Sequence, residues 1–87
     1  MRFQDELVSR EDRFSIGVDT QTGEFYLSIP VKNTLIDYEE YYRLSPGERD
    51  RYIADKALAS MFAAECRNRL HDDRLILKPG RDRGEPW

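Results

Sequence analysis

The chain has 87 residues, of which 39% are hydrophobic and 36% are charged, with a net charge of −3. This length suits one domain with one modest core, and ten aromatic residues argue against disorder. The acidic balance argues against a nucleic-acid ligand, because phosphate recognition normally brings a basic excess.

The cysteine content and the N-terminal residues indicate the compartment. Cys66 is the only cysteine, so an internal disulfide is excluded. The segment Met1 to Ser9 carries Arg2, Asp5 and Glu6 and lacks the apolar core of a signal peptide. No apolar run approaches the roughly 18 residues of a membrane span. We therefore expect a cytoplasmic protein that does not contact membranes.

Two alternating segments predict a β-hairpin near the N-terminus. Residues 13–18 place Phe14, Ile16 and Val18 on one side, and residues 24–31 alternate in the same way. Between them, residues 19–23 are typical of a turn, with Gly23 able to adopt a positive φ. A third alternating segment, residues 34–44, completes a three-strand meander. Before the hairpin, we expect no more than a frayed helical turn over residues 5–9.

A helix is predicted after the meander. Ser45-Pro46-Gly47-Glu48 has the pattern of a capping box, with proline at the first helical position. Helical spacing continues to about Leu70. The predicted buried stripe comprises Ile53, Ala54, Ala57, Leu58, Met61, Phe62 and Ala64. Asp55 offers an alternative, since it can cap a second helix and create a break near residues 54–56.

The remaining residues complete the predicted architecture. Residues 74–77 are expected to form a short fourth strand, and residues 79–87 an irregular or flexible tail rich in glycine and proline. We therefore predict a single α+β domain over residues 1–78. Its small antiparallel sheet consists of the three-strand meander plus a short C-terminal strand, with one main α-helix packed on one face.

The third strand carries the clearest functional signal. One face bears residues suited to a core, namely Ile36, Tyr38, Glu40, Tyr42 and Leu44. The opposite face is acidic with aromatics among the charges, and it defines a candidate partner-binding site. That site comprises Asp37, Glu39, Tyr41, Tyr26 and Glu24. Tyrosine buries large area at small entropic cost, so Tyr41 and Tyr26 are the expected anchors. The alternative is a solvated acidic strand.

No catalytic or metal-binding pattern is found. His71 lies five residues after Cys66, so the two side chains point to different sides of a helix. A zinc site needs more cysteine or histidine than the chain contains, and only Asp37 and Glu39 share a side of their strand. We expect a protein that is not an enzyme and that has no metal and no cofactor.

Some segments resemble known proteins. The strings Tyr26–Val31, Asp37–Tyr42 and Lys78–Gly84 look like segments of small bacterial proteins without assigned function. In size, acidity and α+β build, the chain resembles immunity proteins of bacterial toxin systems. That resemblance implies an inhibitor that occludes the active site of a cognate toxin, such as a basic nuclease domain. The alternative is a self-associating structural or regulatory module that forms a homodimer through a sheet edge.

Overall fold

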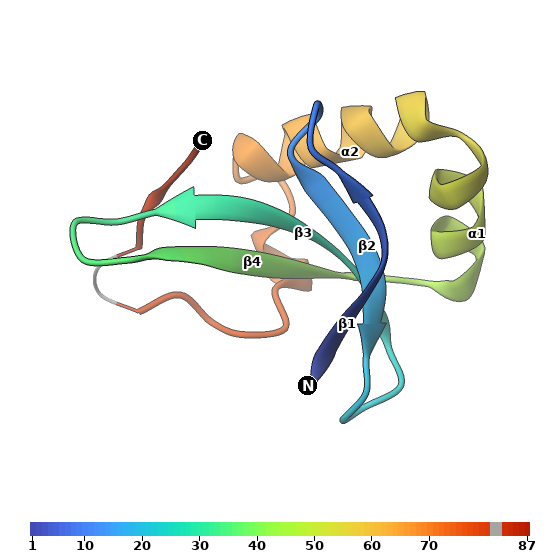
Figure 1. The fold of residues 1–87 in the computed structure, drawn as a ribbon, viewed down its shortest axis with the longest axis horizontal. Helices are drawn as coiled ribbons and strands as arrows, with labels where there is room; N and C mark the ends of the chain where they lie inside the picture. The colour runs from blue at the N-terminus through green and yellow to red at the C-terminus, as the bar shows by residue number, and fades with distance from the viewer. Residues whose placement is uncertain (81–82) are drawn as a thin grey trace.

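The computed structural model describes residues 1–80 and 83–87. Its elements are β1 (Phe3–Ser9), β2 (Phe14–Asp19), β3 (Phe25–Lys32), β4 (Asp37–Leu44), α1 (Pro46–Ala54), α2 (Lys56–Arg67), the 3-10 helix η1 (Asp72–Arg74) and β5 (Glu85–Pro86). β1 to β4 form an antiparallel sheet in chain order, and β5 pairs with β3 (Figure 1). The predicted α+β class, a small sheet with packed helix, is confirmed.

The first strand corrects the sequence analysis. The expected helical turn over residues 5–9 is wrong, because residues 3–9 form β1 at the edge of the sheet. A bulge separates Asp5 from Leu7 in the pairing with β2. It turns Leu7 toward the hydrophobic core while Phe3 and Asp5 remain on the other face. This bulge interrupts the regular alternation that would have predicted a strand.

The hydrophobic core lies between the sheet and α2. The strands contribute Phe14, Ile16, Leu27, Ile29, Val31, Tyr42 and Leu44, and α2 contributes Ala59, Phe62, Ala63 and Cys66. The α2 positions follow the i, i+3, i+4, i+7 spacing of one helical face. The predicted buried stripe is wrong at Met61, Ala57 and Ala64 of α2, because Met61 is 63% exposed and the two alanines are also exposed. The buried face of α2 is rotated relative to the predicted one.

The helix caps explain why the buried face differs from the predicted one. Ser45 Oγ accepts a hydrogen bond from the Glu48 amide at 3.1 Å, and Glu48 Oε1 accepts one from the Ser45 amide at 2.9 Å. The predicted capping box is therefore present. Asp55 then ends α1 and caps α2 by accepting from the Ala57 amide at 3.1 Å. The helical segment is divided at Asp55, the alternative that its capping ability suggested.

The C-terminal region packs against the sheet. The strand predicted over residues 74–77 is reduced to η1 and one bridge, between Leu75 and Tyr42. Residues 79–87 were expected to be irregular, yet Glu85 and Pro86 pair with Lys32 and Val31 as β5. Residues 81–82, which belong to that predicted tail, lie outside the described residues.

Arg83 links this C-terminal segment to the core. Its guanidinium bonds Glu40 at 2.9 Å and Asp72 at 2.7 Å, and Glu40 is only 6% exposed. The Gly84 amide donates to the Tyr38 hydroxyl at 2.8 Å. Glu40 therefore faces the helix-covered side of β4 with its charge matched by an arginine that lies 43 positions later.

Candidate functional site

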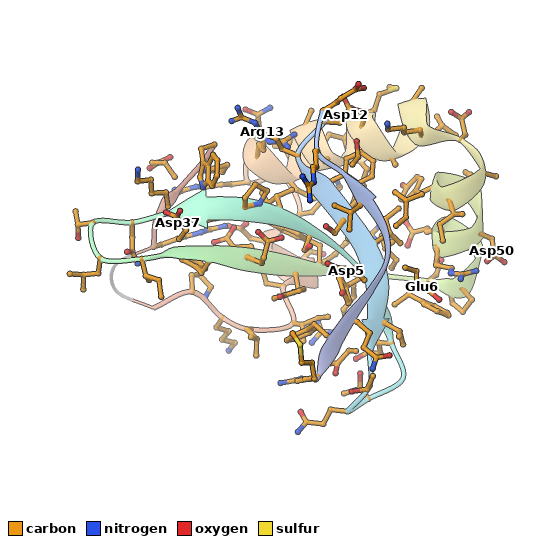
Figure 2. All side chains as sticks on the ribbon, in the orientation of Figure 1. Asp5, Glu6, Asp12, Arg13, Asp37 and Asp50 are labelled. Atoms are coloured by element: carbon orange, nitrogen blue, oxygen red, sulfur yellow. The ribbon has the colours of Figure 1, made fainter. Side chains whose placement is uncertain are left out.

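The predicted site residues share one face of the sheet, opposite the helices. Asp37, Glu39 and Tyr41 alternate along β4, and Tyr26 lies on β3, where its neighbour across the sheet is Arg43. Glu24 directly precedes β3. Figure 2 shows Asp37 near the β3–β4 turn and Asp5 on β1, further along the molecule. The period of two along β4 places these side chains together.

Tyr26 is not exposed, and the expectation of an open face around it is wrong. β1 lies over it, so that its relative exposure is 0%. The Phe3 ring stacks on Tyr41 with centroids 3.8 Å apart, and both rings meet Tyr26 edge to face, at 5.5 and 5.0 Å. Phe3 belongs to one edge strand of the sheet and Tyr41 to the other. The sheet must therefore curl strongly to bring them into contact.

Gly17 allows β1 to approach this closely. A Cβ atom on Gly17 would lie 2.0 Å from the Gln4 carbonyl oxygen and 2.5 Å from the Tyr26 hydroxyl. The missing side chain leaves room for the Tyr26 hydroxyl, which donates to Asp5 Oδ1 at 2.6 Å. Burial, followed by this bond to Asp5, raises the pKa of Tyr26. Tyr26 therefore supports the face from beneath.

Asp5, Glu39 and Tyr41 form what we call the acidic cluster. Glu39 accepts from Ser28 Oγ at 3.0 Å. Burial is the main cause that raises the pKa of Glu39, and the negative charge of Asp5 adds to it. Burial also raises the pKa of Tyr41, helped by the charges of Glu39 and Asp5. The two carboxylates thus come from β1 and β4, and the charge of Asp5 disfavours the charged form of Glu39.

Asp5 was not predicted as a site residue. It was assigned to a helical turn, and its relation to Glu39 arises only when the sheet curls. Phe3 and Leu7 offered the only apolar signal for a strand here, but Asp5 separates them and the bulge after Asp5 places them on opposite faces. Pairing across the curl brings together residues 34 positions apart, which periodicity within a strand cannot reveal.

The other two predicted acids lie at the margins of the face. Glu24 forms an ion pair with Arg43 at 3.4 Å, with both side chains more than 40% exposed. Asp37 is exposed at the start of β4 and makes no ion pair with the residues that the structure describes. Glu24 is thus partly neutralised, while Asp37 lies opposite Lys32 in the β3–β4 pairing without a direct ion pair to it.

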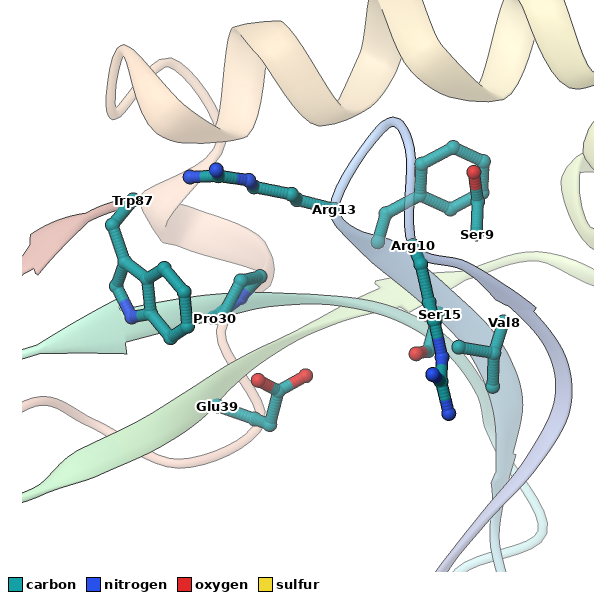
Figure 3. A pocket seen from close by; sticks show the side chains of 9 residues that line it. Val8, Ser9, Arg10, Arg13, Ser15, Pro30, Glu39 and Trp87 are labelled. Carbon is teal, nitrogen blue, oxygen red and sulfur yellow. The ribbon is translucent and has the colours of Figure 1, made fainter.

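A groove of about 250 Å³ adjoins the acidic cluster, with Glu39 in common. Figure 3 shows Val8, Ser15 and Arg10 on one wall and Pro30 and Trp87 on the other, with the Arg13 side chain extending toward Trp87. The groove lies where β2 and β3 part, because their pairing ends at Ser15 and Ser28. Sequence reasoning missed it, since Trp87 had been assigned to an irregular tail.

The β1–β2 turn beside this groove is fixed by α2. Arg13 has a positive φ of 55°, an uncommon backbone conformation outside glycine. Arg67 of α2 donates to the carbonyl oxygens of Asp12 and Arg13 at 2.7 and 2.6 Å. These bonds hold the turn in place, so the groove wall is anchored to the helix layer.

The remaining polar residues of interest have structural partners. Cys66 is buried, and burial raises its pKa to about 12, which keeps the thiol protonated. His71 Nε2 lies 2.7 Å from Glu65 Oε1, and its ring stacks on Phe62 at 4.5 Å. Within residues 1–80 and 83–87, no group of three or more potential metal ligands is found.

Comparisons with known proteins do not identify a family or a function for this chain. The chain matches no protein-family model, no curated protein and no solved structure. In the part of the chain that the structure describes, neither helix has the length and apolar character needed to cross a membrane. The function therefore has to be argued from the residues of the face and the groove.

Proposed function

We propose that this chain is a cytoplasmic protein-binding module of the toxin-immunity type, which neutralises a basic partner by covering its active site. The observation that carries this proposal is the acidic cluster. Tyr26, whose hydroxyl donates to Asp5 at 2.6 Å, packs edge to face on Tyr41. Glu39 precedes Tyr41 by two residues on the same side of β4, so the two carboxylates border one aromatic patch. A lysine or arginine placed between them would relieve both the repulsion and the cost of burial.

The neighbouring side chains suit the same partner. Tyr41 is partly buried, so it retains surface for contact, and it is held in place by stacking on Phe3. Such a rigid aromatic loses little entropy when it is buried at an interface. Asp37 extends the negative charge toward the β3–β4 turn. In this proposal Tyr26 positions Asp5 and Tyr41 and does not itself touch the partner.

Binding of this kind needs neither catalysis nor a cofactor. Negative charge on the face would steer a basic domain during diffusional encounter, and the rate of association would fall with salt. A nuclease domain fits this description, because its substrate-binding surface has to be basic to hold phosphate groups. The inhibitor would compete for that surface with its own carboxylates.

The partner for the test is to be sought as a basic toxin-like domain among the neighbouring reading frames, and a candidate found there is purified for the measurement. Association and dissociation rates are measured for the wild type and for Asp5→Asn combined with Glu39→Gln. We expect affinity to fall by about tenfold or more, with the association rate falling most at low salt. Tyr41→Ala should mainly raise the dissociation rate.

A matched control distinguishes the effect of these two carboxylates from the effect of a change in net charge. Asp50→Asn combined with Asp73→Asn removes the same charge from exposed residues on α1 and η1. This control should leave the affinity within about twofold. Equal affinities for the wild type and the Asp5/Glu39 double variant, with both proteins folded, would rule out this face as the binding site.

Self-association through a sheet edge is a second candidate function. β1 is the first strand of the sheet, and among the described strands only β2 pairs with it. An edge with unpaired backbone groups can pair with a strand of another chain. Sizing of the pure protein tests this candidate, since a strictly monomeric chain would exclude it.

A further inference from the structure

The β3–β4 turn presents an exposed apolar pair. Leu35 is 83% exposed and Ile36 is 63% exposed, at adjacent positions. Asn33 fixes their backbone: its Oδ1 accepts from both amides at 2.8 Å, and its own amide donates to the Ile36 carbonyl at 3.1 Å. A stiff turn thus projects two aliphatic side chains beside the exposed carboxylate of Asp37. Because the backbone of this turn is already fixed, little conformational entropy is lost when its side chains bind a partner.

The groove between the β1–β2 turn and the C-terminal segment has the complementary shape. Its walls include Val8, Pro30 and Trp87, of which Val8 is 57% and Trp87 is 47% exposed. Its volume of about 250 Å³ lies just below the range of roughly 300–1,000 Å³ that is typical of small-molecule pockets. It is therefore better suited to one or two side chains than to a cofactor.

The lining of the groove carries two arginines, Arg10 and Arg13, together with the carboxylate of Glu39. Six arginines elsewhere each lie within 4 Å of a carboxylate: Arg2, Arg43, Arg49, Arg69, Arg74 and Arg83. Arg10 and Arg13 of the rim have no such partner among residues 1–80 and 83–87. The Arg13 guanidinium instead lies 5.4 Å from the centre of the Trp87 ring.

A further guanidinium adds to this positive charge. The pKa of Arg67 is lowered by burial and then by the charge of Arg13, so the two guanidiniums repel each other. Glu11 and Asp12 belong to the same turn and Glu39 lines the groove, but within the described residues none of the three lies within 4 Å of the Arg10 or Arg13 guanidinium. An incoming carboxylate would be stabilised at the rim, provided that apolar groups accompany it into the groove.

We propose that the groove receives the β3–β4 turn of a second copy of this chain. Leu35 and Ile36 of one copy pack against Trp87, Val8 and Pro30 of the other, and Asp37 pairs with Arg10 and Arg13. Shape and charge agree on this occupant: an aliphatic pair beside a carboxylate meets an apolar slot beside unpaired arginines. The proposal rests on the groove and the turn; it shares Glu39 and Asp37 with the proposed binding face, so the dimer and the basic partner would compete for these residues.

The same contact made twice closes a dimer. Each copy carries one turn and one groove, so reciprocal insertion satisfies both sites in a two-fold arrangement. Contact in one direction only would instead leave a free turn and a free groove, and would produce open chains. The proposal is the closed dimer, since reciprocal insertion leaves neither copy with a free turn or a free groove.

Trp87 gives a direct readout, because it is the only tryptophan in the chain. The full chain is studied by sedimentation and by tryptophan fluorescence over a concentration series. We expect a dimer at high concentration, with an emission shift to shorter wavelength as Trp87 loses contact with water. Leu35→Ser combined with Ile36→Ser should raise the dimer dissociation constant by about tenfold or more and abolish the shift.

Two further variants sharpen this test. Arg10→Gln combined with Arg13→Gln should weaken the dimer and reduce its salt dependence. Met61→Ser, which alters an equally exposed apolar residue on α2, should change neither signal. Circular dichroism confirms that each variant is folded.

Three results would overturn the proposal. The first is a chain that stays monomeric with constant Trp87 emission at every concentration. The second is a dimer unaffected by the Leu35/Ile36 change, which would assign association to another surface such as the edge of β1. The third is a monomer whose Trp87 emission shifts only on adding the basic partner, which would assign the groove to that partner.

Discussion

Tyr26 and Leu27 are adjacent on β3 and equally buried, yet they point to opposite faces of the sheet and are covered by different parts of the chain. Leu27 belongs to the core that α2 covers. Tyr26 is covered by β1, through Phe3, and by the ring of Tyr41. One face is thus closed by a separate layer of helix, whereas the other is closed by curling of the sheet itself.

The two faces also differ in their charged groups. The helix-covered face carries a dense apolar core and one matched buried ion pair, between Glu40 and Arg83. The opposite face combines the stacked rings of Phe3 and Tyr41, both edge to face with Tyr26, with the carboxylates of Asp5 and Glu39, and neither α1 nor α2 lies over them. A binding surface can occupy the second face because its rigidity comes from aromatic contacts beneath the charges.

The largest effect should come from Tyr26, if the second face is truly closed. We expect Tyr26→Ala to cost about 3–5 kcal/mol of unfolding free energy, as for other buried aromatics. Tyr26→Phe is the matched control, which keeps the ring and loses the bond to Asp5, at about 0.5–1.5 kcal/mol. Urea denaturation measures both. A cost below about 1 kcal/mol for Tyr26→Ala would mean that this face is open in solution.

A similar loss is expected when the helix-covered face loses its buried counter-charge. Arg83→Met leaves Glu40 buried without a cation, at an expected cost of about 3–5 kcal/mol by denaturation. Arg69→Met removes another arginine that reaches the C-terminal segment, but its partner Glu85 is 84% exposed. That control should cost about 0–1 kcal/mol. Equal effects of the two changes would show that residues 83–87 are not part of the folded domain.

Leu27 tests the helix-covered core on its own. Leu27→Ala should cost about 2–4 kcal/mol, because it leaves a cavity among packed aliphatic residues. Thr22→Ala in the exposed β2–β3 turn provides the reference, with an expected change of no more than about 0.5 kcal/mol. If Leu27→Ala were tolerated as well as Thr22→Ala in thermal and urea unfolding, the assignment of this core would be wrong.

The smallest effect concerns the charge of Glu39. Its folded-state pKa is raised above the unfolded value, so the folded protein holds this proton more tightly. The charged form therefore costs stability above the folded pKa, and this cost is relieved as pH falls toward the unfolded value near 4.3. Glu39→Gln should equal or exceed the wild type in stability at neutral pH.

The pH dependence of the difference isolates this contribution. Other acids act in the opposite direction, since arginine partners lower the pKa values of Asp19, Glu48 and Asp72. Subtracting the stability curves of wild type and Glu39→Gln cancels their effect. The difference in unfolding free energy between Glu39→Gln and the wild type should decrease as pH falls from neutral toward 4. An increase in this difference at lower pH would contradict a raised pKa for Glu39.

Local patterns in the sequence determined the main elements. The alternation over residues 13–18, 24–31 and 34–44 predicted three strands, and Ser45 with Glu48 predicted where the helix begins. These signals hold because strand periodicity and helix capping depend on residues within a few positions of one another. For the same reason, the face shared by Asp37, Glu39 and Tyr41 could be derived from β4 alone.

Only the tertiary structure decided how the faces are closed. β1 covers Tyr26 because Gly17 lets the backbone approach, and the bulge after Asp5 hides this strand from a test of alternation. Arg83 neutralises Glu40, and Trp87 forms a groove wall, although both follow a segment with the composition of a loop. These contacts join residues tens of positions apart, and their energy comes from desolvation and charge matching that exist only once the sheet has curled.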